Sequence, residues 1–250
     1  MNRGLYIAGT GMMLQRRRME TITNNIANAD TTGFRRENLI SHSFDEVMIN
    51  RINDARAPGY TAEVGPLRFG TQTEQIYIDF STGSLEQTER TTDLALAGDA
   101  FFVIGTPDGE RYTKAGAFYI DNLGYLVDGD GNFLLSDNGP IYVGGPNFTV
   151  DTLGGISADG EYLGNIRVVS FEDNGTLRKQ GDNLLYAEAA PIEGGEYSIY
   201  QGYLENSNVD VAREMVDMLT VFRAYETNQR MLTMVDEING KAVNDIARSR

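Results

Sequence analysis

The 250-residue sequence lacks cysteine and tryptophan and has a single histidine, His42. Without cysteine, disulfides, thiolate metal sites and cysteine nucleophiles are excluded. One histidine excludes paired-histidine metal motifs and leaves one residue for any Ser-His-Asp chemistry. The patterns GxSxG, GxxxxGK[ST] and HExxH are also missing. We therefore expect no catalytic residue, no cofactor, no metal ligand and no small-molecule substrate.

Asp128, Asp130 and Asn132 in DGDGN have the spacing that begins a calcium loop. Such a loop has glycine at its sixth position and glutamate at its twelfth, where this sequence has Phe133 and Gly139. A hairpin turn is the better interpretation. The 36 acidic side chains make carboxylate pairs inevitable, but no spacing singles out a pair for glycosidic cleavage.

The formal charge of −15 argues against a general nucleic-acid binder, which presents a basic face to phosphates. Residues 1–36 have six basic and two acidic side chains, a net of +4. Residues 209–250 have six basic and seven acidic side chains, a net of −1, and subtracting both from the total leaves −18 for the middle. A basic terminal segment and an acidic body indicate different surroundings for the two parts.

Long apolar runs are missing as well, and no stretch approaches the ~20 apolar residues of a membrane span. Residues 5–14, LYIAGTGMML, have the length of a signal-peptide core. However, the basic residues Arg16–Arg18 follow this stretch instead of preceding it, and no small-residue cleavage site is evident. We expect no cleavable signal.

An amphipathic helix is expected from Leu5 to Ala29. Its apolar residues alternate spacings of three and four, the heptad rule for a helix that packs along another helix. The stripe consists of Leu5, Ala8, Met12, Gln15, Met19, Ile22, Ile26 and Ala29. Burying its five large side chains contributes roughly 8–15 kcal/mol, at ~1.5–3 kcal/mol each. Ordering about 25 residues costs at least ~1 kcal/mol each in backbone entropy, so we expect this helix to order against a partner.

A second apolar stripe lies at the other end of the chain. It consists of Val211, Met215, Met218, Phe222, Tyr225, Leu232, Val235, Ile238, Ala242 and Ile246, with Gln229 in its one gap. About 38 residues of helix would span roughly 57 Å, a length typical of a rod-like element. The two stripes predict helices that pair and join the chain ends. An ordinary two-helix face inside one globular domain fits the same periodicity.

The residues between the helices divide into two parts. Residues 37–90 predict an extended connector with one short helix, which a capping box at Ser43–Glu46 would begin and Ala57-Pro58-Gly59 would end. Residues 91–203 are short runs rich in Val, Ile, Tyr and Phe, typical of antiparallel strands. Their strongest hairpin signals are Asp108-Gly109, Asp130-Gly131 and Asn174-Gly175.

The expected fold class is α+β, with N- and C-terminal helices paired as a coiled coil and an inserted antiparallel β-rich domain, similar to a barrel or sandwich. The expected divisions are 1–36 for the N-terminal helix, 37–90 for the connector, 91–203 for the β-rich domain and 204–250 for the C-terminal helix.

Four motifs, in order along nearly the whole chain, resemble those of the bacterial flagellar rod and hook family. They are NNIANADTTGFRR (24–36), TTDLALAGDAFFVI (91–104), YTKAGAFYIDNLGYLVDGDGN (112–132) and ENSNVDVAREMVDMLTVFRAYETNQRML (205–232). The resemblance implies a structural subunit of the flagellar basal-body rod, without catalysis, that polymerises into the tubular drive shaft between motor and hook. The paired helices would form its inner layer and the β-rich domain would face outward.

The implied partners are copies of the chain, other rod and hook subunits, and the flagellar type III export apparatus. Both proximal-rod and distal-rod types fit. The expected assembly interface combines the two stripes with three asparagines that form hydrogen bonds between subunits. Its residues are Leu5, Met12, Met19, Ile22, Asn24, Asn25, Ile26, Asn28, Met215, Met218, Phe222, Tyr225, Leu232, Val235 and Ile238.

Two other classes of function are open. A secreted carbohydrate-active protein that trims the cell wall around the rod would need two carboxylates in a cleft, one with a raised pKa. A monomeric surface adhesin with a helical stalk would show its full helical content as a monomer.

Overall fold

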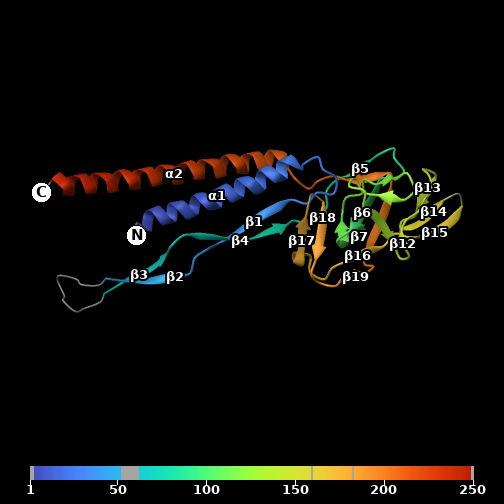
Figure 1. The fold of residues 1–250 in the computed structure, drawn as a ribbon, viewed down its shortest axis with the longest axis horizontal. Coiled ribbons are helices and arrows are strands. Elements are labelled where there is room, and N and C mark those ends of the chain that lie inside the picture. The colour runs from blue at the N-terminus through green and yellow to red at the C-terminus, as the bar shows by residue number, and fades with distance from the viewer. Residues whose placement is uncertain (1–2, 52–61, 159, 182, 249–250) are drawn as a thin grey trace. The chain divides into compact units, whose positions relative to one another are not determined.

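The computed structural model describes residues 3–51, 62–158, 160–181 and 183–248 (Figure 1). Helices α1 (Arg3–Ala27) and α2 (Val211–Arg248) stand at the two ends of the chain, with strands between them, so the fold class is α+β. The chain divides into two compact units. The helical unit contains residues 1–26, 37–77 and 211–250, and the β unit contains residues 27–36 and 78–210.

Both predicted helices are present, and α2 has the expected length of 38 residues. After α1 the chain makes a turn in which Thr31 N–H donates to the Asn28 carbonyl and Gly33 has a φ of 70°. α2 begins after a turn in which the Ser207 hydroxyl accepts the Val209 N–H. None of the described helices combines the length and the apolar character that crossing a membrane requires.

The short helix expected after Ser43 is wrong, because Glu46–Arg51 forms strand β2. β2 pairs antiparallel with β3 (Ala62–Arg68), where Val47 lies opposite Leu67. β1 (Glu37–Ser43) pairs with β4 (Thr71–Ile78). Partners distant in sequence therefore outweigh the local capping pattern, since strand formation depends on cross-strand neighbours. The expected helix end at Ala57-Pro58-Gly59 lies outside the described residues.

The β unit is organised around strand β7 (Ala100–Thr106), which is buried on both faces. Phe102 and Ile104 belong to one hydrophobic cluster, whereas Phe101 and Val103 belong to another. Because successive side chains of a strand point to opposite faces, β7 separates two cores.

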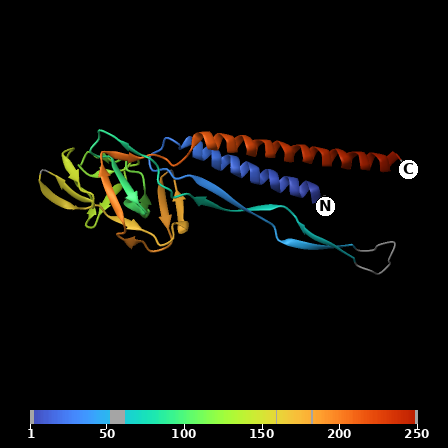
Figure 2. The same cartoon turned by 180° about the vertical axis from the view of Figure 1, so that it is seen from behind.

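The largest sheet of the β unit has the order β17-β18-β8-β7-β11-β10-β9, with β12 beside β11 and β16 pairing with both β7 and β19. Figure 2 shows the strands of this unit from behind. Its other strands are β8 (Gly109–Thr113), β9 (Tyr119–Ile120), β10 (Leu126–Val127), β11 (Phe133–Ser136), β12 (Gly139–Pro140), β16 (Val168–Ser170), β17 (Leu177–Gln180), β18 (Leu184–Ala187) and β19 (Ile192–Glu193). The smaller sheets contain β13 (Phe148–Val150), β14 (Gly155–Ala158) and β15 (Glu161–Asn165); β6 (Leu94–Gly98) and β20 (Tyr197–Gln201); and β5 (Leu85–Gln87) and β21 (Tyr203–Glu205). Neighbouring strands in this unit pair antiparallel, as expected.

One kind of turn occurs three times in the described part of the β unit, beginning at Asp121, Asp128 and Asp151. In each turn one carboxylate oxygen accepts the N–H groups of the residues two and four positions later. The residue three positions later is a glycine with positive φ. The DGDGN segment is therefore a hairpin turn between β10 and β11, as predicted.

The hairpin predicted at Asp108-Gly109 is confirmed, since it joins β7 to β8. The hairpin predicted at Asn174-Gly175 is wrong. These residues form a single 3-10 turn in which the Asp173 carboxylate accepts the Gly175 N–H. A side chain that caps the backbone locally competes with hairpin geometry, and here the cap prevails.

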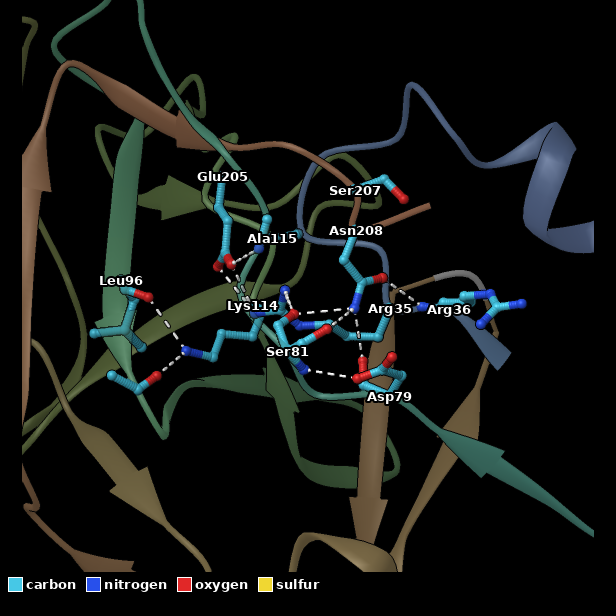
Figure 3. Close-up of polar contacts among 12 residues, drawn as sticks. Arg35, Arg36, Asp79, Ser81, Leu96, Lys114, Ala115, Glu205, Ser207 and Asn208 are labelled. Atoms are coloured by element: carbon cyan, nitrogen blue, oxygen red, sulfur yellow. Dashed lines mark hydrogen bonds and ion pairs between the residues drawn. The ribbon is translucent and has the colours of Figure 1, made fainter. Parts of the chain in front are cut away.

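A buried ion pair in the β unit holds together the residues that follow α1 and those that precede α2. Arg35 Nη2 lies 2.9 Å from Glu205 Oε1, with side chains only 3% and 2% exposed. Asn208 accepts the backbone N–H of Arg36 and donates to the carbonyl of Asp79 (Figure 3). Removing either member of the ion pair would leave an unpaired buried charge, so segments 170 residues apart depend on each other.

Lys114 lies close to this ion pair and is 4% exposed. Its ammonium donates to the carbonyls of Leu96 and Gly98 and lies 5.5 Å from the centre of the Phe101 ring (Figure 3). Burial lowers the pKa of Lys114 to about 8, because the charged form loses its hydration, and the nearby Glu205 carboxylate opposes this shift.

Gly33→Ala should lower the free energy of unfolding of the β unit by roughly 3 kcal/mol or more. Its φ is +70°, and an added Cβ would lie 2.4 Å from the backbone nitrogen of Ala115. Gly131→Ala is the matched control: its φ is +84°, but nothing lies within 4 Å of the added Cβ. The control should cost only about 1–2 kcal/mol. Equal costs in urea unfolding, followed by tyrosine fluorescence, would contradict this packing.

The stability of the β unit should rise between pH 8 and 9.5. In this window the unfolded chain keeps the proton of Lys114, whose ordinary pKa is 10.5, whereas the folded chain loses it near a pKa of about 8. Stability rises with pH wherever the unfolded state binds more protons, here by at most about 3 kcal/mol. Thermal unfolding at several pH values measures the effect, and Lys114→Met should abolish it. A wild-type slope retained in that variant would refute the assignment.

Candidate assembly interface

α1 and α2 lie alongside each other in the helical unit and run in opposite directions (Figure 1). Asn25 Nδ2 lies 3.3 Å from Glu214 Oε2, and both residues are 1% exposed. An added Cβ at Gly11 would lie 3.0 Å from the Asn228 Nδ2. These two contacts are fourteen residues apart on each helix, from 11 to 25 and from 214 to 228. Fourteen residues are two heptads, so both contacts fit one antiparallel register.

Asn25 also connects α1 to the start of β1. Its side-chain oxygen accepts the Glu37 N–H at 2.9 Å, and its amide nitrogen donates to the Glu37 carbonyl at 2.9 Å. One buried amide thus uses both its donor and acceptor groups, contacting a strand and a second helix. Its hydrogen bonds lie within the helical unit, not on an exposed surface.

The other two predicted asparagines have different surroundings. Asn24 is exposed on α1. Asn28 is half-buried in the β unit, where its side-chain oxygen accepts the Thr31 hydroxyl at 3.2 Å. A role for Asn24, Asn25 or Asn28 between subunits stays a prediction.

Glu214 and Asn228, the α2 residues of these two contacts, belong to a stripe that alternates spacings of four and three. It consists of Glu214, Met218, Val221, Tyr225, Asn228, Leu232 and Val235, of which Glu214 and Val221 are buried and the rest half-buried. Four of the predicted interface residues belong to this stripe: Met218, Tyr225, Leu232 and Val235. The other three, Met215, Phe222 and Ile238, are 53%, 48% and 65% exposed. The single predicted stripe of α2 therefore divides into a covered part and an exposed part.

On α1 the predicted stripe is mostly half-buried. Met12, Met19, Ile22 and Ile26 are half-buried and Leu5 is 42% exposed. Gly11 and Asn25, which lie next to α2, are sequence neighbours of Met12 and Ile26. One residue corresponds to about 100° of rotation on a helix, so the contact lies beside the predicted stripe.

Sequence reasoning missed the buried residues Leu14 and Thr21 on α1 and the polar contacts of Glu214 and Asn228 on α2. A signal for the second pair does exist in the sequence. Glu214, Val221 and Asn228 are spaced by seven, and single polar residues at such core positions fix helix register. A search for apolar residues alone passes over this pattern.

A pocket of about 310 Å³ lies in the helical unit beside α1. Its lining residues are Tyr6, Thr10, Met13, Leu14, Arg16, Arg17, Phe44, Thr71 and Gln72. In the described part of the chain, no group of three or more His, Asp or Glu side chains is placed to hold a metal ion. The helices expose apolar and charged side chains, and protein–protein interfaces consist of such groups.

Known proteins match the chain along its whole length. Residues 5–35 match the family model "Flagella basal body rod protein", residues 95–178 match "Flagellar hook protein FlgE/F/G D1 domain", and residues 200–245 match "Flagellar basal body rod FlgEFG protein C-terminal".

Three relatives illustrate the similarity. The flagellar basal-body rod protein FlgG of Bacillus subtilis is 35% identical over 98% of this chain and 99% of its own length. The flagellar hook-basal body complex protein FlhO of the same organism is 32% identical over 99% of this chain and 100% of its own length. The flagellar basal-body rod protein FlgF of Caulobacter vibrioides is 31% identical over 99% of both chains.

These relatives are named for a place in the basal-body rod or hook–basal body complex and not for a reaction. The alternative of a cell-wall-trimming enzyme is therefore not supported. The chain belongs to the flagellar basal-body rod protein family, and it is a structural subunit of the flagellar basal body and not an enzyme.

Proposed function

We propose that copies of this chain polymerise, together with other rod and hook subunits, into the tubular shaft that transmits torque from motor to hook. The observation that carries this proposal is the large apolar surface that α1 and α2 leave exposed. Its largest members on α2 are Met215, Leu219, Phe222, Met231, Met234 and Ile238, each at least 48% exposed. Large exposed apolar areas mark protein interaction sites.

The energetics of α1 favour the same conclusion. Of its five large stripe residues, Leu5 is exposed and the rest are only half-buried, so burial within one copy supplies less than the ~1.5–3 kcal/mol available for each. Helices of this length are marginal in water without packing partners. Further burial against neighbouring copies would provide the missing stabilisation.

We infer that the two helices pair as an antiparallel coiled coil in the assembled shaft. The contacts of Asn25 with Glu214 and of Gly11 with Asn228 support this, since both fit one register. The four-three alternation from Glu214 to Val235 is the spacing that such packing requires. Residues 1–36 and 204–250, which contain the two helices, would then form the core of the subunit, with 37–90 as connector.

Residues 91–203 would serve as the outer domain, with a barrel-like or sandwich-like architecture. The burial of β7 on both faces supports a layered arrangement, because sheet-on-sheet packing buries a strand between two cores. Asn24, Asn25 and Asn28 remain candidates for hydrogen bonds at the subunit boundary.

We also infer that the subunit is exported unfolded by the flagellar type III apparatus. Two features favour this route. The chain has no cysteine, so no disulfide hinders unfolding. Its termini gain much of their stabilisation from neighbours, which would keep a single copy from assembling before it arrives.

Ile22→Asp should abolish polymerisation and swimming while leaving the β unit folded. Ile22 is half-buried on α1, and a carboxylate there loses hydration when neighbouring helices pack against it. Thr23→Asp is the matched control, because Thr23 is exposed on the same turn of the helix. Electron microscopy of the purified protein and motility in a complemented deletion strain are the measurements. Normal shafts from the Ile22 variant would refute the role of this surface.

Purified single copies should show less helix than the 25 residues of α1 and 38 of α2 require, and should gain helix on assembly. The physical reason is that ordering costs ~1 kcal/mol or more per residue, which neighbours offset. Circular dichroism and limited proteolysis, before and after polymerisation, provide the test. A dilute monomer with both ends fully helical and protease-resistant would instead favour the adhesin with a helical stalk.

A further inference from the structure

α2 presents a second apolar face, whose side chains are exposed. Met215, Leu219 and Phe222 are spaced by four and three, so they lie along one side of the helix. They are 53%, 59% and 48% exposed. Glu226 follows Phe222 by one turn and continues the same line. The face therefore combines three large apolar side chains with a carboxylate at its end.

The pocket beside α1 has an apolar interior. Tyr6 and Phe44 form one wall, with ring centroids 6.5 Å apart, and Met13 and Leu14 contribute another. Leu14 is 7% exposed, whereas Tyr6 and Met13 are 44% and 63% exposed. The pocket volume is about 310 Å³, at the lower end of the range for small-molecule sites. A large side chain fits into a pocket of this volume.

The polar groups of this pocket have unused capacity. The Thr71 hydroxyl oxygen is buried without a hydrogen-bond partner in the described structure. Arg16 and Arg17 share a single carboxylate, that of Glu20, at 3.6 Å and 3.4 Å. Their side chains are 60% and 62% exposed, so the group carries one excess positive charge at an accessible edge.

We propose that this pocket receives the Met215–Glu226 face of α2 from a second copy of the chain. Phe222 would enter the apolar interior, and Glu226 would pair with the guanidinium groups of Arg16 and Arg17. The match in chemistry is twofold: an apolar side chain faces an apolar interior, and a carboxylate faces an excess of positive charge. This inference rests on the proposed self-assembly and names the surfaces that carry it.

The two surfaces belong to different parts of the same molecule, so the contact is heterologous. A self-complementary patch would close two copies into a dimer, whereas a heterologous contact leaves one free surface at each end of a growing chain of subunits. Open-ended growth is the property that a shaft requires. The second face of α2 would thus connect successive copies, while its first face, from Glu214 to Val235, packs on α1 of its own copy.

Charge reversal tests the polar half of the contact. Arg17→Glu and Glu226→Lys should each raise the critical concentration for polymerisation about three- to tenfold, because like charges then meet at the interface. The double variant restores an opposite-charge pair and should return within about twofold of the wild type. If the two residues did not touch, the defects of the single variants would add, and the double variant would polymerise worse than either. Wild-type polymerisation by both single variants would overturn the proposal.

Phe222→Ala tests the apolar half and should raise the critical concentration at least about tenfold, as for a central aromatic anchor. Val243→Ala is the control: Val243 is 66% exposed on the same helix but lies beyond the proposed contact. It should polymerise like the wild type. Equal effects of the two substitutions would contradict a specific seat for Phe222.

Cross-linking provides a direct measurement, since the chain has no cysteine of its own. Met13→Cys protein mixed with Leu219→Cys protein should form disulfide-linked pairs on polymerisation, whereas Met13→Cys with Val243→Cys should not. Polymers without the first cross-link would overturn this inference and leave the proposed function intact. A wild-type chain that forms no polymer, alone or with rod partners, would overturn both.

Discussion

The rest of the structure depends on one constraint: the two long helices have more apolar side chains than a single copy of the chain can bury. Hydrophobic burial is proportional to the area removed from water, so exposed methionine, leucine and phenylalanine side chains represent stabilisation that the single molecule does not obtain. α2 has this character on more than one side. In the proposed assembly, the terminal segments of the subunit would gain their rigidity from neighbouring copies.

Polar contacts give this apolar system its geometry. Hydrophobic contacts have no preferred direction. A buried amide or carboxylate loses its hydration, and only accurately placed hydrogen bonds offset that loss of free energy. Asn25 satisfies both its donor and acceptor groups through Glu37 and Glu214. In the β unit, Arg35 with Glu205 and the hydrogen bonds of Asn208 do the same for the segments next to the helices. Apart from those between Asn25 and Glu37, these contacts join residues at least 129 positions apart, so the two chain ends depend on each other.

The β unit uses local chemistry to achieve the same precision. Its repeated turns each combine an aspartate that caps two N–H groups with a glycine at positive φ. Turns of this kind bring short strands into register without long loops, and the strands then bury β7 from both sides. The acidic composition of the middle of the chain arises partly from these structural aspartates, which need no ligand to account for them.

The sequence by itself determined the two terminal helices, the strand-rich middle and the DGDGN turn, because periodicity and turn chemistry are local properties. It did not determine strand β2, where a short helix was predicted, since the pairing of β2 with β3 depends on residues distant along the chain. Nor did it select the face of each helix that packs inward. α2 has apolar residues on several sides, so a shift of one residue still gives a plausible stripe. Only the tertiary structure, through the contacts of Gly11, Asn25, Glu214 and Asn228, decided which stripe is covered and which is exposed, because these contacts join residues far apart along the chain.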